Sequence, residues 1–149
     1  MQPASSRLRF AVVVGVIVAG ALSNACGPTA RSTDYRAGSE SFAFTVSTDP
    51  IPPHAREPAR YRVIVRDKET RQPIENGEGQ IFASSQDGAN TWDALLPGPE
   101  LGSYYGTLNF ITSGTWAMAI RFRLDSTEAL ERVDWTQDVM AARNEPVQY

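Results

Sequence analysis

The chain has 149 residues, of which 42% are hydrophobic and 21% charged, with one cysteine, one histidine and a net charge of −3. This length holds one domain, which excludes a two-domain cofactor enzyme. A single cysteine excludes an intramolecular disulfide, and a single histidine excludes chemistry that needs several imidazoles. The acidic balance, with no run of Lys or Arg, predicts no nucleic-acid partner.

Residues 1–25 have the pattern of an export signal. Arg7 and Arg9 precede the continuous apolar stretch 10–22, and small or polar residues follow up to Cys26. The stretch is shorter than the roughly 18 to 20 residues that cross a bilayer as a helix, so we predict an N-terminal signal helix that is cleaved.

Two cleavage routes are open after Ala25. The segment resembles a bacterial lipoprotein signal, in which Cys26 becomes the acylated first residue, although Leu22 stands one position early for that pattern. An ordinary signal peptidase would also accept Ser23 and Ala25. We predict lipidation of Cys26, because a free exported thiol is a liability. The membrane partner would then be reached through acyl chains on Cys26, with the protein facing the periplasm.

Removal of residues 1–25 takes two arginines and no acid, which moves the net charge from −3 to −5. Residues 26–40 lack apolar periodicity and are rich in small and polar side chains, so we predict a flexible tether. A folded domain is predicted over 41–140 and a C-terminal tail over 141–149.

Most of 41–140 alternates apolar and polar residues, as half-buried strands do. The predicted inward faces are, in chain order, Phe42, Phe44 and Val46; Tyr61, Val63 and Val65; Tyr104, Gly106, Leu108 and Phe110; and Trp116, Met118, Ile120, Phe122 and Leu124. Shorter strands are predicted at 80–84 and 91–95. The four prolines of 49–58 exclude a helix or a central strand there.

The segment 126–142 admits two interpretations. Val133, Trp135 and Val139 suit a last strand, whereas Asp125 would cap a helix. We predict the strand. About seven short strands separated by Pro and Gly indicate an all-β fold, and we predict an immunoglobulin-like antiparallel β-sandwich.

The stretch from Pro50 to Phe122 resembles the YtkA-like and FixH-like group of small exported domains. The matching features are Pro50, Pro52 and Pro53, the strand Tyr61 to Asp67, the turn ending Pro73-Ile74, and Gly102-Ser103-Tyr104 followed by Leu108, Phe110, Ser113-Gly114 and Trp116. The resemblance implies an immunoglobulin-like, non-enzymatic module beside membrane electron-transfer machinery. Such a module would be an extrinsic subunit or assembly factor of a respiratory oxidase or photosynthetic reaction centre. The alternative is a periplasmic small-ligand or copper-handling carrier.

Periplasmic copper sites need several convergent His, Met or Cys side chains. Met118 belongs to a predicted core face, Met140 has no imidazole near it in sequence, and His54 is predicted to be exposed. We therefore predict no metal site and no cofactor. No Gly-x-Ser-x-Gly elbow accompanies His54, so we predict no catalytic residue and a protein that is not an enzyme.

Exposed arginines are candidates for contact with a protein partner. Arg60, Arg62 and Arg66 are predicted on the outer face of one strand, and Arg121 and Arg123 on that of another. If these strands are neighbours, the five side chains form a basic strip suited to an acidic protein face or lipid head groups. Scattered ion pairs with the 17 acids are the alternative.

The proline segment and several aromatic residues are the other candidates for contact. These residues are Pro52, Pro53 and His54 in the loop, and Tyr104 or Tyr105, Trp92 and Tyr149 among the aromatics.

Overall fold

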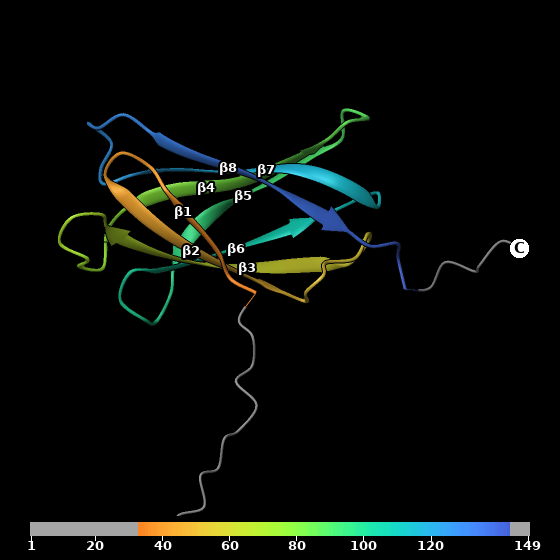
Figure 1. The fold of residues 1–149 in the computed structure, drawn as a ribbon, viewed down its shortest axis with the longest axis horizontal. Helices are drawn as coiled ribbons and strands as arrows, with labels where there is room; N and C mark the ends of the chain where they lie inside the picture. The colour runs from red at the N-terminus through yellow and green to blue at the C-terminus, as the bar shows by residue number, and fades with distance from the viewer. Residues whose placement is uncertain (1–32, 144–149) are drawn as a thin grey trace, which may run out of the picture. The chain divides into compact units, whose positions relative to one another are not determined.

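The computed structural model describes residues 33–143 (Figure 1). The predicted signal and Cys26 lie outside these residues. The strands are β1 (Tyr35–Gly38), β2 (Phe42–Asp49), β3 (Pro58–Asp67), β4 (Glu78–Ser85), β5 (Asn90–Pro97), β6 (Ser103–Asn109), β7 (Gly114–Arg123) and β8 (Glu131–Val139). Residues 33–143 contain no helix, and hence none that could span a membrane. The prediction of an all-β fold is confirmed.

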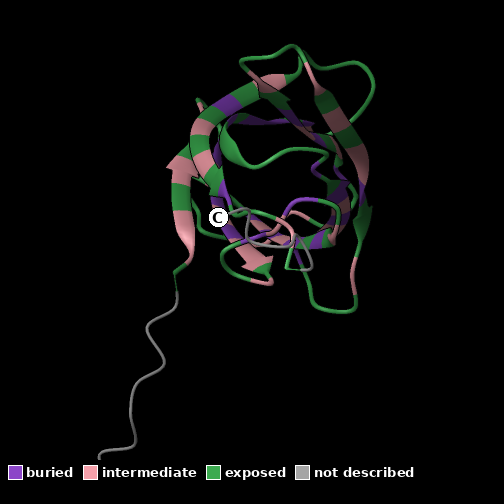
Figure 2. Cartoon of the chain, turned by 90° about the vertical axis from the view of Figure 1, so that its right-hand side faces the viewer, coloured by how far each residue is buried: buried purple, intermediate pink, exposed green. Residues whose placement is uncertain are grey.

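All eight strands belong to one antiparallel sheet in the order β1-β2-β3-β6-β5-β4-β7-β8. Figure 2 shows this sheet curled around the buried residues. Its two edges meet where the Tyr35 ring stacks on Trp135 at 5.1 Å and the Tyr35 hydroxyl donates to the Asp134 carbonyl at 3.2 Å. The sheet is therefore nearly closed, and the two-layer sandwich stays a prediction.

Strand β1 corrects two predictions, the count of about seven strands and the extent of the tether. It lies within the predicted tether 26–40 and pairs with β2, with Tyr35 opposite Val46 and Ala37 opposite Phe44. The side chains of Tyr35 and Ala37 are half-buried and pack against the core. Only two inward positions are too few to reveal a strand by periodicity, so the sequence pattern missed it. The rest of the predicted tether, up to residue 32, lies outside the described residues.

The predicted inward faces form the core. Buried side chains on these faces are Phe42, Phe44, Val46, Tyr61, Val63, Val65, Tyr104, Leu108, Phe110, Trp116, Met118, Ile120 and Phe122. The Phe122 ring meets those of Phe42 at 5.2 Å and Tyr104 at 5.1 Å, in the edge-to-face geometry that aromatic quadrupoles favour. Leu124 is an exception at 41% exposed, because β7 ends at Arg123 and the chain turns there.

Within the segment 126–142, Glu131–Val139 form strand β8, so the predicted strand is confirmed and the helical alternative is wrong. In β8, Val133 lies opposite Ile120 and Trp135 opposite Met118, so the alternation continues the core of β7. Val133 and Val139 are buried, and the residues between them alternate between half-buried and exposed.

Candidate binding surface

Strand β5 presents two large apolar side chains to the outside. Trp92 is 63% exposed and Leu96 is 64% exposed, whereas Leu95 points into the core. Single exposed apolar residues are ordinary on protein surfaces. These two each line a hollow, one on either side of β5. We call this surface, with Phe82, Tyr105, Arg60 and Arg121 around it, the β5 face.

The first hollow has a volume of about 440 Å³ and lies over β4, β5 and β7. Its lining includes Gln80, Phe82, Ser84, Asn90, Trp92 and Arg121. Phe82 is the register partner of Trp92 on β5 and of Ala119 on β7. Register partners share a face of a sheet, so the two aromatic side chains lie side by side on the outer surface.

Two guanidinium groups lie over the Phe82 ring. The Arg121 group is 5.0 Å from the ring centroid and that of Arg132 is 4.9 Å from it. Arg132 is neutralised by Asp134, whose carboxylate accepts its hydrogen bonds at 2.6 and 2.8 Å. These bonds hold the pKa of Asp134 below its usual value. Arg121 makes no salt bridge with any residue of 33–143, although its charge interacts with that of Asp134.

The second hollow has a volume of about 530 Å³ and lies on the other side of β5. Its lining includes Arg60, Asp93, Leu96, Pro97, Pro99, Tyr105 and Thr107. Leu96 and Tyr105 are register partners. Beside them, Glu100 accepts a hydrogen bond from the Tyr105 hydroxyl at 3.1 Å and lies 3.6 Å from the Arg62 guanidinium. A hydrogen bond from the Ser103 side chain contributes most to holding the pKa of Glu100 below its usual value, and the bond from Tyr105 and the charge of Arg62 add to this effect.

The second hollow lies where β5 pairs with β6 only through its last two residues, Leu96 and Pro97. Earlier in β5, side chains rather than backbone carbonyls accept the hydrogen bonds of the β6 amides. The Asp93 carboxylate accepts the Thr107 amide at 2.7 Å, and the Thr91 hydroxyl accepts the Asn109 amide at 3.3 Å. A side-chain acceptor reaches farther from its strand than a backbone carbonyl does. The two strands can therefore lie farther apart here than in a regular pair while the amides of β6 keep their hydrogen bonds.

The five predicted arginines do not form one basic strip. Arg60, Arg62 and Arg66 lie on β3, which pairs with β2 and β6, whereas Arg121 and Arg123 lie on β7, which pairs with β4 and β8. The strip required β3 and β7 to be neighbours, and they are not. Arg60 and Arg121 line separate hollows.

Two of these arginines are engaged elsewhere. Arg123 forms a salt bridge with Glu78 at 2.9 Å, and Arg66 donates to the Arg71 carbonyl at 3.2 Å.

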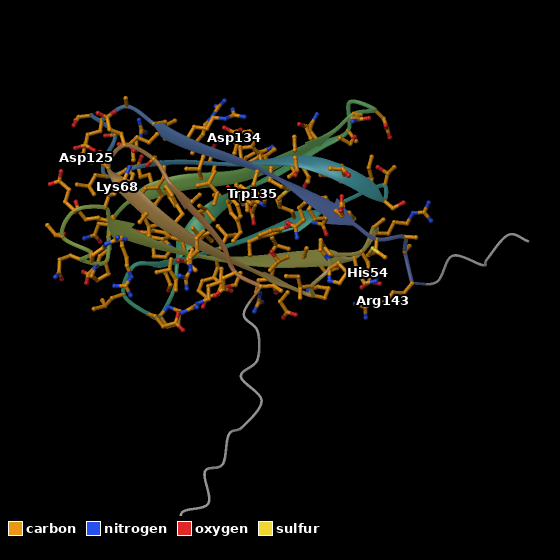
Figure 3. All side chains as sticks on the ribbon, viewed as in Figure 1. His54, Lys68, Asp125, Asp134, Trp135 and Arg143 are labelled. Atoms are coloured by element: carbon orange, nitrogen blue, oxygen red, sulfur yellow. The ribbon has the colours of Figure 1, made fainter. Side chains whose placement is uncertain are left out.

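The proline loop is bound to the end of β8 rather than free. The Met140 amide donates to the Pro53 carbonyl, and the Ala55 amide donates to the Met140 carbonyl, both at 2.8 Å. His54 is half-buried, which corrects the prediction that it is exposed, and its ring Nδ1 has no hydrogen-bond partner within residues 33–143. Pro53 is buried, so only Pro52 of the three is exposed. The loop lines neither hollow. Figure 3 shows His54 at the same end of the domain as Arg143.

The same contacts place Met140 beside His54, although 86 positions separate them in the chain. No imidazole lies near Met140 in the sequence, because the two residues meet only through tertiary structure. Within 33–143 there is no group of three or more His, Cys, Asp or Glu residues placed to hold a metal ion. The prediction that Met118 packs in the core is confirmed.

Among the predicted contact aromatics, Trp92 and Tyr105 belong to the β5 face. Tyr104 is buried, and Tyr149 lies outside the described residues. Phe82 was missed, although the alternation of 80–84 with 90–95 around the turn at Gly88 would have paired it with Trp92.

Comparisons of the chain with models of protein families, with curated proteins and with solved structures find no match. The resemblance to the YtkA-like and FixH-like group therefore stays a prediction.

Proposed function

We propose that the protein is a non-enzymatic, lipid-anchored binding module of the cell envelope that uses the β5 face to hold its partner. The observation that carries this proposal is the pair of exposed side chains on β5, Trp92 and Leu96, each beside a hollow. Trp, Tyr and Arg are the residue types that dominate binding energy at protein interfaces, and the β5 face combines all three.

Charge favours a partner with acidic groups. Arg60 and Arg121 form no salt bridge within the described chain, although the protein as a whole is acidic. Arginines without a salt bridge attract an acidic partner to the face on which they lie. The acidic groups on the other faces of the protein repel the same partner.

The proposed placement at the membrane rests on Cys26. The Asp34 carboxylate accepts a hydrogen bond from the Ser47 hydroxyl at 2.7 Å, so the proposed tether runs from Cys26 to Thr33. A flexible chain of eight residues has an end-to-end distance of about 14 to 17 Å, so the domain would sit close to the lipid surface. The partner is then itself a membrane-bound component, and an extrinsic subunit or assembly factor of an electron-transfer complex is the form that the resemblance implies.

The strand order supports the proposed immunoglobulin-like fold. Strands β2 to β8, taken as A to G in chain order, are arranged A-B-E-D-C-F-G across the sheet. An immunoglobulin constant-type domain has A, B, E and D on one sheet and C, F and G on the other. On this assignment β5 is strand D, at the boundary between the two layers.

Crosslinking in native cells tests the binding module. A photo-crosslinking amino acid at Leu96 is expected to give a discrete product in the membrane fraction, and one at the exposed turn residue Glu69 is not.

Cys26→Ser is expected to release the protein from the membrane, and intact mass should show three acyl chains on wild-type Cys26. A wild-type protein that gives no Leu96 product, or an unmodified Cys26, contradicts the corresponding part of the proposal.

A copper-handling carrier is the second candidate, on the observation that a backbone bridge brings His54 and Met140 together. An imidazole with a partnerless ring nitrogen and a thioether are both copper ligands. Within residues 33–143 no group of three or more His, Cys, Asp or Glu is placed to hold a metal ion, so the residues present do not fit a copper centre. We expect titration with Cu(I) or Cu(II) to show no stoichiometric, saturable site. A one-to-one site lost in His54→Ala would reverse the order of the two candidates.

A further inference from the structure

We propose that the first hollow binds a glycan whose sugar rings carry carboxylate groups, with Trp92 as the stacking platform and Arg121 as the ligand of a carboxylate. This inference rests on the proposed function, because it names the ligand class of one half of the β5 face. The volume of about 440 Å³ lies within the roughly 300 to 1,000 Å³ typical of small-molecule sites, so it accommodates a few sugar rings.

Trp92 offers a flat aromatic surface with no partner of its own. Its side chain is 63% exposed, and within residues 33–143 no ring stacks on it. The face of an aromatic ring carries the negative part of its quadrupole. The C–H groups on one face of a pyranose ring carry small positive charges, so a sugar packs favourably on such a surface. Phe82, beside Trp92, is already covered by guanidinium groups, which leaves the indole as the platform.

The polar side chains around the platform suit hydroxyl groups. Gln80, Ser84 and Asn90 are exposed and line the hollow, and their side chains make no hydrogen bond with the described chain. Two planar amides and a hydroxyl supply both donors and acceptors, as a sugar hydroxyl requires.

Arg121 adds a fixed positive charge at the edge of this site. The Phe82 ring orients its guanidinium group, and no acid lines the hollow. Asp134 attracts Arg121 weakly, but it is already held by the hydrogen bonds of Arg132. A planar guanidinium binds a carboxylate with two parallel hydrogen bonds, so an acidic sugar is preferred over a neutral one.

An acidic peptide fits this hollow less well. Extended peptides bind a sheet by adding a strand to a free edge. The strand at the centre of the hollow, β4, is paired on both sides, with β5 and β7. Recognition must therefore come from side chains projecting from the sheet, which is how a sugar ring is held.

The test uses the full mature protein in mild detergent, titrated calorimetrically with trigalacturonic acid and, separately, with neutral maltotriose. We expect trigalacturonate to bind about tenfold tighter or more, and its affinity to fall with salt. Trp92→Ala should weaken both sugars at least tenfold. Arg121→Gln should bring the two affinities within about twofold of each other, while Arg123→Gln, a matched arginine paired with Glu78, should change neither. Both Trp92 and Arg121 are exposed, so melting temperatures are expected to stay near that of wild type.

No binding of either sugar at millimolar concentration, or binding that survives Trp92→Ala, overturns the glycan proposal. Tighter binding of octaglutamate than of trigalacturonate, or a dimer in sedimentation that Trp92→Ala dissociates, also overturns it and assigns the hollow to an acidic peptide or a second copy. If the sugars fail while the Leu96 crosslink persists, the binding module stands without the glycan. If both fail, the proposed function falls as well.

Discussion

The hydroxyl group of Tyr104 allows a sharp test of how the β3–β4 connection is held. Tyr104 is buried on β6, and its oxygen accepts the Gly77 amide at 3.0 Å. The hydroxyl proton has two acceptors within reach, the carbonyl oxygens of Ile74 at 2.7 Å and Glu75 at 2.9 Å. Tyr104→Phe removes this oxygen and leaves the ring.

The expected cost follows from the groups left behind. The substitution leaves the Gly77 amide and a backbone carbonyl without a hydrogen-bond partner, and water does not take the place of the hydroxyl group at this buried site. An unsatisfied buried group costs about 1 to 3 kcal/mol. We therefore expect Tyr104→Phe to lower the free energy of unfolding by about 2 kcal/mol. For a domain of this size, that corresponds to a fall of about 8 °C in melting temperature.

Tyr105→Phe is the matched control on the adjacent residue. The Tyr105 hydroxyl donates to the exposed Glu100 carboxylate, where water can take its place. We expect a change within about 0.5 kcal/mol. Urea denaturation followed by circular dichroism, with thermal melting alongside, measures both variants. Equal and small effects of the two substitutions would refute the reasoning, because they would mean that the hydrogen bond from the Gly77 amide to the Tyr104 hydroxyl does not stabilise the fold.

Two further predictions concern packing and pH. A Cβ at Gly77 would lie 2.1 Å from the Phe122 ring, so Gly77→Ala should destabilise by about 1 to 3 kcal/mol in urea denaturation, whereas Gly38→Ala, where the nearest atom is 3.6 Å away, should be nearly neutral. Burial raises the pKa of Tyr61 above its ordinary value, so the folded state holds this proton more tightly than the unfolded chain. The stabilisation is fully present below about pH 10, where unfolded tyrosine ionises, and is lost as the pH rises further. Urea midpoints measured from pH 8 to 11 should therefore fall above pH 10, less steeply in Tyr61→Phe; equal slopes in both proteins would contradict this assignment.

The faces of the long strands could be predicted from the sequence alone. Alternation has a period of two in any strand, so Phe44, Val63 and Trp116 could be assigned to the core without knowledge of their neighbours. The same reasoning chose a strand over a helix for Glu131–Val139. Of the binding surface, Trp92 and Tyr105 were foreseeable as outward aromatic residues. The short strand Tyr35–Gly38 was not, because it has too few inward positions to form a pattern.

The neighbours of each strand were decided only by tertiary structure. Alternation states which side of a strand Arg60 and Arg121 occupy, but not that their strands lie apart in the sheet. Pairing between strands joins residues distant in sequence, as it does for His54 and Met140, and no local pattern records it. The sequence by itself therefore determined an all-β core and the outward residues, and it predicts an export signal. The closing of the sheet, the opening between β5 and β6, and the second hollow beside it depend on contacts between strands distant in sequence, such as the hydrogen bond from the Thr107 amide to the Asp93 carboxylate, which form only when the strands meet.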